Sequence, residues 1–232
     1  MNSDLITVNK LSKSYPSRQG KISVLHESVL HEIDLLIKKS EMTAIIGVSG
    51  SGKTTLLNLL GCLDRPDSGK IFYGPEEVTT LSNIELANYR NHHIGFVFQR
   101  FHLIPELFSI ENVLLPLRIA GMSGVEALEK AERVLKDVGL EDKLWNKPSE
   151  LSAGQKQRVG IARAIVNSPK VLLADEPTGN LDSNTTNEIA NLLETLTARE
   201  MAVVVATHNP ELARRCAKRY ELKNGRLHEI KL

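Results

Sequence analysis

The chain has 232 residues and a formal net charge of +1 at pH 7, with 29 Lys and Arg against 28 Asp and Glu. Such a balance gives no overall field that would draw nucleic acid or an anionic membrane surface, so neither is an expected partner. Cys62 and Cys216 lie far apart without metal-ligand spacing, which favours free buried thiols in a reducing compartment over a disulfide. No apolar run approaches the roughly 18 residues of a membrane span, and the N-terminus lacks a secretion-signal pattern. We therefore expect one cytosolic α/β domain with two lobes and no insertion into the bilayer.

The first part of the chain predicts an antiparallel β layer. Residues 5–11, 29–38 and 70–73 carry the alternation of apolar and polar side chains that is typical of strands. Between the first two, residues 24–27 and 29–32 both read VLHE, which leaves the strand register ambiguous. We interpret the repeat as a local duplication without a function of its own.

A phosphate-binding loop is predicted where residues 42–60 change from an apolar strand to glycines and then to a helical pattern. The pattern GxxxxGK[ST] fits, because glycines bring backbone N–H groups close to phosphate oxygens and the helix adds its positive end. Lys53 would meet the β- and γ-phosphates, and the Thr54 hydroxyl would bind Mg²⁺. An ordinary glycine turn is the alternative. The expected phosphate-site residues are Gly47, Val48, Ser49, Gly50, Ser51, Gly52, Lys53, Thr54 and Thr55.

The middle of the chain predicts a helical insertion. Residues 94–98 form a β-rich run, and residues 101–108 then hold two Phe, two Leu, an Ile and a Pro. This apolar stretch suits either docking of a partner helix or packing inside the helical lobe. Residues 125–138 have helical spacing with Gly139 at the C-terminal cap.

Short buried strands return in the last third, at residues 171–174 and 202–206, with a helix predicted over 184–198 between them. Asn209 and the following proline predict another helix directly after His208. The Asn-Gly pair near the end predicts a β-hairpin. Alternating strands and helices indicate a parallel sheet covered on both faces.

Two adjacent carboxylates, Asp175 and Glu176, follow the apolar run at 171–174. Carboxylates at the end of a buried strand need partners, and a cation supplies one. Beside a phosphate loop, Asp175 is expected to hold Mg²⁺ and Glu176 to act as the general base toward water. Structural acids at a strand end are the alternative.

A second anion site is indicated at residues 151–155, LSAGQ, which precede a helix expected from about 156 to 166. Ser152 and Gly154 would offer a hydroxyl, open backbone N–H groups and a helix dipole. An ordinary helix cap is the weaker reading once a phosphate loop is present. We interpret this site as one that clamps the γ-phosphate bound by a second molecule.

Together these segments resemble the ATP-binding-cassette (ABC) ATPases. The resemblance covers nearly the whole chain, in the order GVSGSGKTT, Gln99, LSAGQ, VLLADE, the NLD of 180–182 and His208. It implies a P-loop NTPase with a RecA-like parallel core, an antiparallel β subdomain and a helical subdomain. Residues 1–232 would form one cassette, with 1–87 and 166–232 as core plus β layer and 88–165 as the helical subdomain. It also implies a head-to-tail homodimer that encloses two ATP molecules with Mg²⁺.

The resemblance assigns further roles by position. Tyr15 would stack on adenine, Gln99 would sense Mg²⁺ and the attacking water, His208 would contact the γ-phosphate, and Asp182 would connect the two sites of the dimer. Read from the residues alone, Gln99 and His208 are polar strand-end residues and Tyr15 a surface aromatic. The segment that completes the partner's site would be Ser152, Ala153, Gly154 and Gln155.

The chain departs from the family pattern in three places. Ala153 stands where glycine is usual, and we expect activity to survive because Ser152 and Gly154 remain. Ser40 replaces the usual glycine before the central strand. The VLHE repeat lengthens the β layer and weakens the assignment of Tyr15.

Within the family, the chain looks like the group that serves lipoprotein release, macrolide-type export and the cell-division cassette. This implies an ATPase on the inner face of the cell membrane, held there by a separate permease. A non-transport cassette acting on nucleic acid or ribosomes is the alternative, but the insertion is too short for long heptads. A slow regulatory ATP-binding scaffold is opposed by Glu176 and His208.

Overall fold

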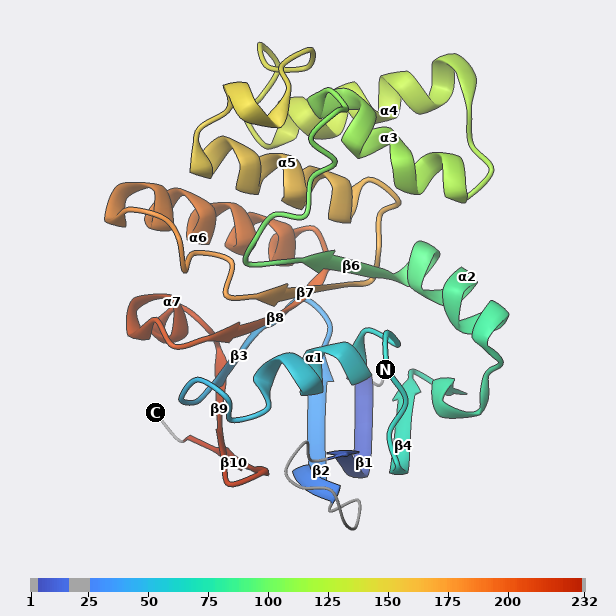
Figure 1. Cartoon of the computed structure of the whole chain (residues 1–232), viewed down its shortest axis with the longest axis vertical. Helices are drawn as coiled ribbons and strands as arrows, with labels where there is room; N and C mark the ends of the chain where they lie inside the picture. Colours follow the sequence, from blue (N-terminus) through green and yellow to red (C-terminus); the bar gives the residue numbers. More distant parts are fainter. Residues whose placement is uncertain (1–3, 17–25, 231–232) are drawn as a thin grey trace.

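The computed structural model describes residues 4–16 and 26–230, which form two β-sheets and seven α-helices within those ranges (Figure 1). Residues 24–25, in the first VLHE copy, lie outside the described residues. The antiparallel sheet has the order β2-β1-β4-β5, and the central sheet has the order β10-β9-β3-β8-β7-β6. The strands of the antiparallel sheet are β1 (Asp4–Pro16), β2 (His26–Lys38), β4 (Ser68–Tyr73) and β5 (Glu76–Glu77). Those of the central sheet are β3 (Met42–Ile46), β6 (Ile94–Val97), β7 (Val171–Asp175), β8 (Ala202–Thr207), β9 (Lys218–Lys223) and β10 (Arg226–Glu229).

The helices connect these strands. They are α1 (Lys53–Leu60), α2 (Asn83–His93), α3 (Ser109–Ile119), α4 (Gly124–Asp137), α5 (Ala153–Ile165), α6 (Ser183–Ala198) and α7 (Pro210–Arg214), with 3₁₀ turns at Val78–Thr80 and Pro148–Glu150. Among the described residues, no helix is long and apolar enough to cross a membrane.

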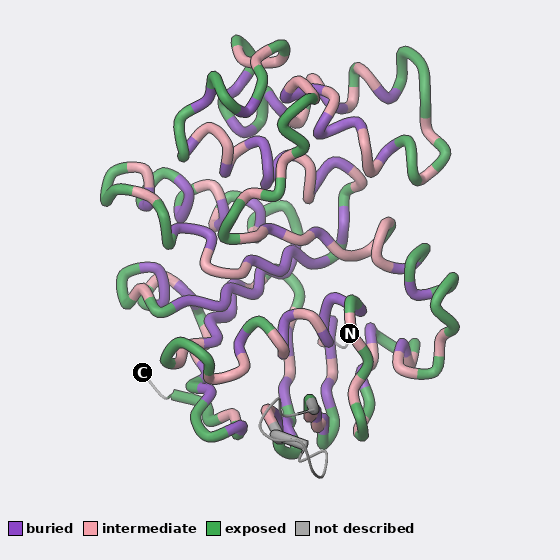
Figure 2. The backbone as a smooth tube through the Cα atoms, in the orientation of Figure 1, coloured by how far each residue is buried: buried purple, intermediate pink, exposed green. Residues whose placement is uncertain are grey.

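The central sheet separates two hydrophobic cores. Side chains alternate across a strand, so Leu172 and Ala174 of β7 enter one core while Val171 and Leu173 enter the other. The first core is shared with α3 to α7, and the second with α1 and the antiparallel sheet. Figure 1 shows these layers on opposite sides of the sheet, and Figure 2 shows buried residues running along its strands. β3 and β6 to β9 pair in parallel, which confirms the α/β class with a parallel core.

The antiparallel sheet confirms the predicted β layer, and its register is irregular. β1 and β2 pair with shifts at several points, one of them between Lys13 and Ser14. Leu30 of the second VLHE copy pairs with Lys13 and is fully buried. The second copy therefore packs into the β layer.

The helical part comprises α3, α4 and α5, which pack on one another. The range 88–165 expected for it also contains β6, which pairs with β7 in the central sheet. α2 begins before that range, capped by Ser82 and Glu85. The boundaries of the subdomain stay a prediction.

Part of the apolar stretch at 101–108 packs inside the helical part, and part of it is exposed to solvent. Leu103 and Phe108 pack against the core that the helices share. Ile104 is 40% exposed, and neighbouring Pro105 is exposed as well. The segment therefore anchors the helical part and still presents apolar surface.

Candidate active site: a nucleotide pocket

The glycine loop lies between β3 and α1, as predicted. Gly52 takes a φ of 103°, in the left-handed region that favours glycine, and no side chain caps the helix that follows it. The first N–H groups of α1 are thus open toward the pocket, with the positive end of the helix dipole behind them. This arrangement binds anions without any further charged group.

Lys53 is buried at the bottom of the loop, with 8% of its surface exposed. Its Nζ donates to the carbonyl oxygens of Gly47 at 2.8 Å and Val48 at 3.1 Å. It also lies 4.0 Å from a carboxylate oxygen of Glu176. The ammonium group is held inside the loop, where a phosphate can reach it.

The residues that would hold Mg²⁺ are adjacent. The Thr54 hydroxyl donates to Asp175 Oδ2 at 2.8 Å. Burial raises the pKa of the Asp175 carboxyl, and the neighbouring Glu176 charge adds to this. A hydroxyl next to a half-buried carboxylate, with the Gln99 amide on the same pocket wall, offers the oxygen ligands that Mg²⁺ prefers.

Glu176 is tightly held although it lies outside regular structure. Its carboxylate accepts hydrogen bonds from the Thr207 hydroxyl at 3.2 Å and the His208 backbone N–H at 3.4 Å. A third contact joins it to His208 Nδ1 at 2.7 Å. Its φ of 46° is unusual for a non-glycine residue, and such backbone strain is typical of functional sites. The carboxylate therefore faces the pocket in a fixed orientation.

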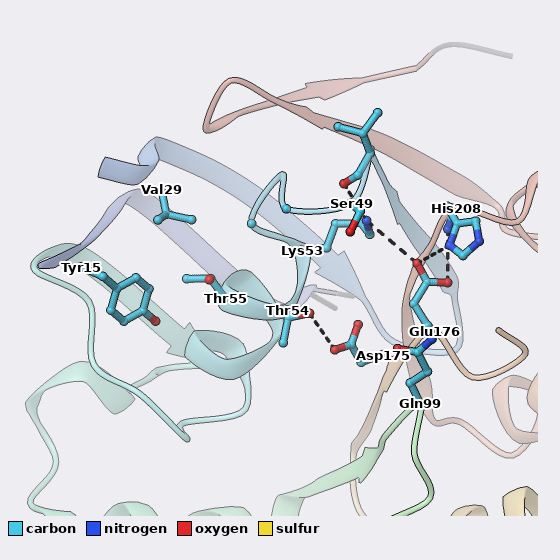
Figure 3. Close-up of a pocket in the computed structure, with 13 residues that line it drawn as sticks. Tyr15, Val29, Ser49, Lys53, Thr54, Thr55, Gln99, Asp175, Glu176 and His208 are labelled. Atoms are coloured by element: carbon cyan, nitrogen blue, oxygen red, sulfur yellow. Dashed lines mark hydrogen bonds and ion pairs between the residues drawn. The ribbon is translucent and has the colours of Figure 1, made fainter. Parts of the chain in front are cut away.

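These groups meet around a pocket of about 660 Å³ (Figure 3). The structure brings together most of the phosphate loop with Gln99, Asp175, Glu176, His208 and Tyr15, although they span the whole chain. The lining residues are Tyr15, Val29, Val48, Ser49, Gly50, Gly52, Lys53, Thr54, Thr55, Gln99, Asp175, Glu176 and His208. Gly47 and Ser51 line an adjoining pocket on the other side of the loop.

The pocket also contains one residue, Val29, that sequence reasoning missed, and sequence reasoning also missed the partner of Tyr15. Val29 lines it and lies against the loop, so that a Cβ on Gly52 would come within 3.0 Å of Val29 Cγ1. Tyr15 donates its hydroxyl to Asp64 Oδ2 at 2.7 Å, and Lys13 lies beneath the ring. The repeat containing Val29 was a usable signal, whereas nothing in the sequence linked Asp64 to Tyr15.

The LSAGQ segment and Asp182 do not line this pocket. Ser152 caps α5 by accepting from the Gln155 backbone N–H at 3.2 Å, and Gln155 Oε1 accepts from the Ser152 backbone N–H at 2.9 Å. Asp182 caps α6 by accepting from both the backbone N–H and the hydroxyl of Thr185, at 3.0 and 2.6 Å. Ala153 is the exposed first residue of α5, in ordinary helical conformation. Within one chain these residues are helix caps, and any contact with a nucleotide requires another copy.

The fold and the pocket define a class before any comparison is made. A glycine loop follows the central strand of a parallel sheet, a buried lysine lies at its base, and a strand-end Asp-Glu pair faces it. This is a nucleoside triphosphate hydrolase of the phosphate-loop type, an α/β protein with an added antiparallel sheet.

Comparison with known proteins narrows the class. A family model described as "ABC transporter" matches residues 30–179. The lipoprotein-releasing system ATP-binding protein LolD of Geobacter metallireducens is 46% identical over 226 residues, 97% of this chain and 98% of that protein. The macrolide export ATP-binding/permease protein MacB 2 of Aeromonas hydrophila is 43% identical over 229 residues, 99% of this chain but 35% of that longer protein.

Comparison with a solved structure supports the same family. That structure is a dimeric, post-hydrolysis state of an ATP-binding cassette bound to ADP and Pi, with a TM-score of 0.88 and 40% identity over 98% of this chain and 99% of that one. The chain therefore belongs to the ABC transporter family, as an ATP-binding ATPase subunit.

Proposed function

We propose that two copies of this chain close around ATP and drive a separate membrane permease. The observation that carries this proposal is that the phosphate loop and the Asp-Glu pair line one pocket, which the LSAGQ segment at the start of α5 does not line within the same chain. The pocket is lined by the loop, Asp175 and Glu176, whereas Ser152 and Gly154 at the start of α5 do not line it. A head-to-tail pair would bring each LSAGQ segment onto the partner's γ-phosphate.

Within the closed site each residue has a defined task. Lys53 and the N–H groups of α1 bind the β- and γ-phosphates. Mg²⁺, held by Thr54 and Asp175 near Gln99, supplies charge neutralisation when bound. Glu176 takes a proton from the attacking water, and His208 contacts the γ-phosphate and orients the Glu176 carboxylate. Tyr15 stacks on the adenine ring.

A groove at the junction of the sheet and the helical part supports a membrane partner. It has a volume of about 460 Å³, and its lining includes Phe98, which directly precedes Gln99 of the nucleotide pocket in the chain. Phe96 and Phe98 stack in its wall, with ring centroids 4.5 Å apart, and Ile119 at its rim is 75% exposed. An amphipathic helix of a permease would bury this surface and transmit closure of the dimer.

The names of the relatives suggest the kind of work involved. Lipoprotein release and macrolide export are the activities that those names state, and we assign this chain to the same group of transport machines. Its place would then be the inner face of the cell membrane, through the permease. Cargo contacts belong to that second protein.

The test is affinity purification from native membranes of tagged wild type and of Ile119→Glu, with Ile84→Glu as the matched control. Ile84 is 76% exposed but does not line the groove. We expect wild type and the control to retain a multi-span protein that Ile119→Glu loses. Recovery of RNA or DNA in its place would support the non-transport alternative.

A further inference from the structure

The end of β1 is attached to the loop that follows the phosphate-loop helix, through four consecutive residues. The backbone O of Ser12 accepts from the Asp67 N–H at 3.0 Å, and Ser14 donates its N–H and hydroxyl to Asp67 at 2.7 and 2.6 Å. Lys13 and Tyr15, two residues apart on one face of the strand, both reach Asp64. The pairing between β1 and β4 ends at Ser12. Beyond that point, side-chain contacts with the loop after α1 hold Tyr15 in place.

Asp64 is the common acceptor of this cluster. Its carboxylate accepts from the Tyr15 hydroxyl at 2.7 Å, from Lys13 Nζ at 3.0 Å and from the Arg65 N–H at 2.7 Å. Although partial burial opposes ionisation, the bonds from Tyr15 and Lys13 hold the pKa of Asp64 below its usual value. The carboxylate is therefore ionised at neutral pH, and ionised acceptors make the stronger hydrogen bonds.

Lys13 contacts both members of the pair. It is only 9% exposed, its Nζ also donates to the Arg65 carbonyl at 2.7 Å, and it lies 5.0 Å from the centre of the Tyr15 ring. A cation over one face of an aromatic ring is attracted to it. One ring face and the hydroxyl are therefore engaged within the protein.

The loop that carries Asp64 is itself rigidly attached. The Leu63 N–H donates to the Asn58 carbonyl of α1 at 2.8 Å, and Arg90 of α2 donates to the Cys62 carbonyl at 2.7 Å. Arg65 reaches across to the Leu81 carbonyl at 2.6 Å. Since α1 is the helix that begins at the phosphate loop, Asp64 connects Tyr15 to the element that binds phosphate.

We propose that Asp64, with Lys13, is a positioning residue for the nucleotide base, which fixes the plane of the Tyr15 ring relative to the phosphate loop. The proposal rests on the proposed ATPase function and on Tyr15 facing the base. In Figure 3, Tyr15 lies with Val29 and Thr55 at the end of the pocket away from Glu176 and His208. Asp64 itself does not line the pocket, so it acts through Tyr15.

The test compares a ligand that has a base with one that lacks it. Binding of ADP and of inorganic pyrophosphate, each with Mg²⁺, is measured by calorimetry for wild type, Asp64→Ala, Tyr15→Phe and the double variant. Loss of a stacked aromatic weakens binding by about 5- to 150-fold, so we expect loss of ring positioning to weaken ADP binding by about 3- to 10-fold. Pyrophosphate affinity stays unchanged. Because Asp64→Ala and Tyr15→Phe remove the same hydrogen bond, we expect their effects on ADP binding to be non-additive.

The matched control is Lys70→Met, which removes a 3.0 Å ion pair with Glu77 on the same β layer, outside the pocket. It leaves both affinities at wild-type values. Equal losses of ADP and pyrophosphate binding in Asp64→Ala, or additive effects in the double variant, would overturn the positioning role. Wild type that binds ADP no more tightly than pyrophosphate would overturn it too, while leaving the ATPase function intact. Failure to bind either ligand would refute the proposed function itself.

Discussion

Replacing Glu176 with Gln separates binding from hydrolysis. The amide keeps the size of the carboxylate and one acceptor oxygen, so the bond from the Thr207 hydroxyl at 3.2 Å can remain. What disappears is the negative charge 4.0 Å from Lys53, an attraction on the order of 4 kcal/mol at an effective dielectric constant of 20, before desolvation is counted. Lys53 is then freer to meet phosphate, and ATP affinity does not fall.

The rate of hydrolysis, unlike ATP affinity, falls in Glu176→Gln. Without a general base the rate falls by about 10²- to 10⁴-fold, which corresponds to roughly 3–5 kcal/mol of transition-state free energy. We expect Glu176→Gln to bind ATP, to release phosphate at this reduced rate and to elute as a dimer in size-exclusion chromatography. Glu188→Gln, which changes a surface acid paired with Arg158, serves as the control and stays near wild type. Phosphate release within tenfold of wild type, or an ATP-bound monomer, would refute the role given to Glu176.

Three further changes test the site and the fold. Lys53→Ala should abolish nucleotide affinity because the phosphate charge contact is lost, and an unchanged ATP titration would contradict this. Asp175→Asn should abolish Mg²⁺-dependent hydrolysis and yet raise the melting temperature of the nucleotide-free protein at pH 7. Burial raises the pKa of Asp175, so wild type carries a cost while the group is ionised, and the difference from Asp175→Asn should shrink as pH falls through that pKa. Ser40→Gly should increase the free energy of unfolding by up to about 1 kcal/mol in urea denaturation, because Ser40 has a φ of 56°.

The sequence predicted best those features whose causes lie within a few residues. β7 and β8 are continuous apolar runs because helices cover both faces of the parallel sheet. The hairpin at Asn224 and Gly225 follows from their left-handed backbone, with φ of 50° and 71°. α2 was missed because its composition is polar, although Ser82 and Glu85 form a capping box that marks its start.

The site was predictable where a local pattern carries the chemistry. Gln99, Glu176 and His208 reach the pocket from three strand ends because parallel strands bring their carboxyl ends to one edge of the sheet. The Tyr15–Asp64 bond joins residues 49 positions apart, and no periodicity connects them. Contacts of that kind depend on how β1 packs against the loop between α1 and β4, which neither partner's local sequence encodes.

In the LSAGQ segment, Ala153 stands where glycine is usual in the family, whereas the glycine at position 154 is retained. The structure explains why only the first of the two can be replaced. Ala153 is exposed at the first position of α5 in helical conformation, where alanine is favourable. Gly154 is buried, and a Cβ there would come within 2.4 Å of Thr185 Cγ2. Thr185 in turn donates its hydroxyl to Asp182 at 2.6 Å. Gly154 therefore allows the start of α5 to lie directly on the start of α6, so the two segments assigned to the dimer contact form one surface.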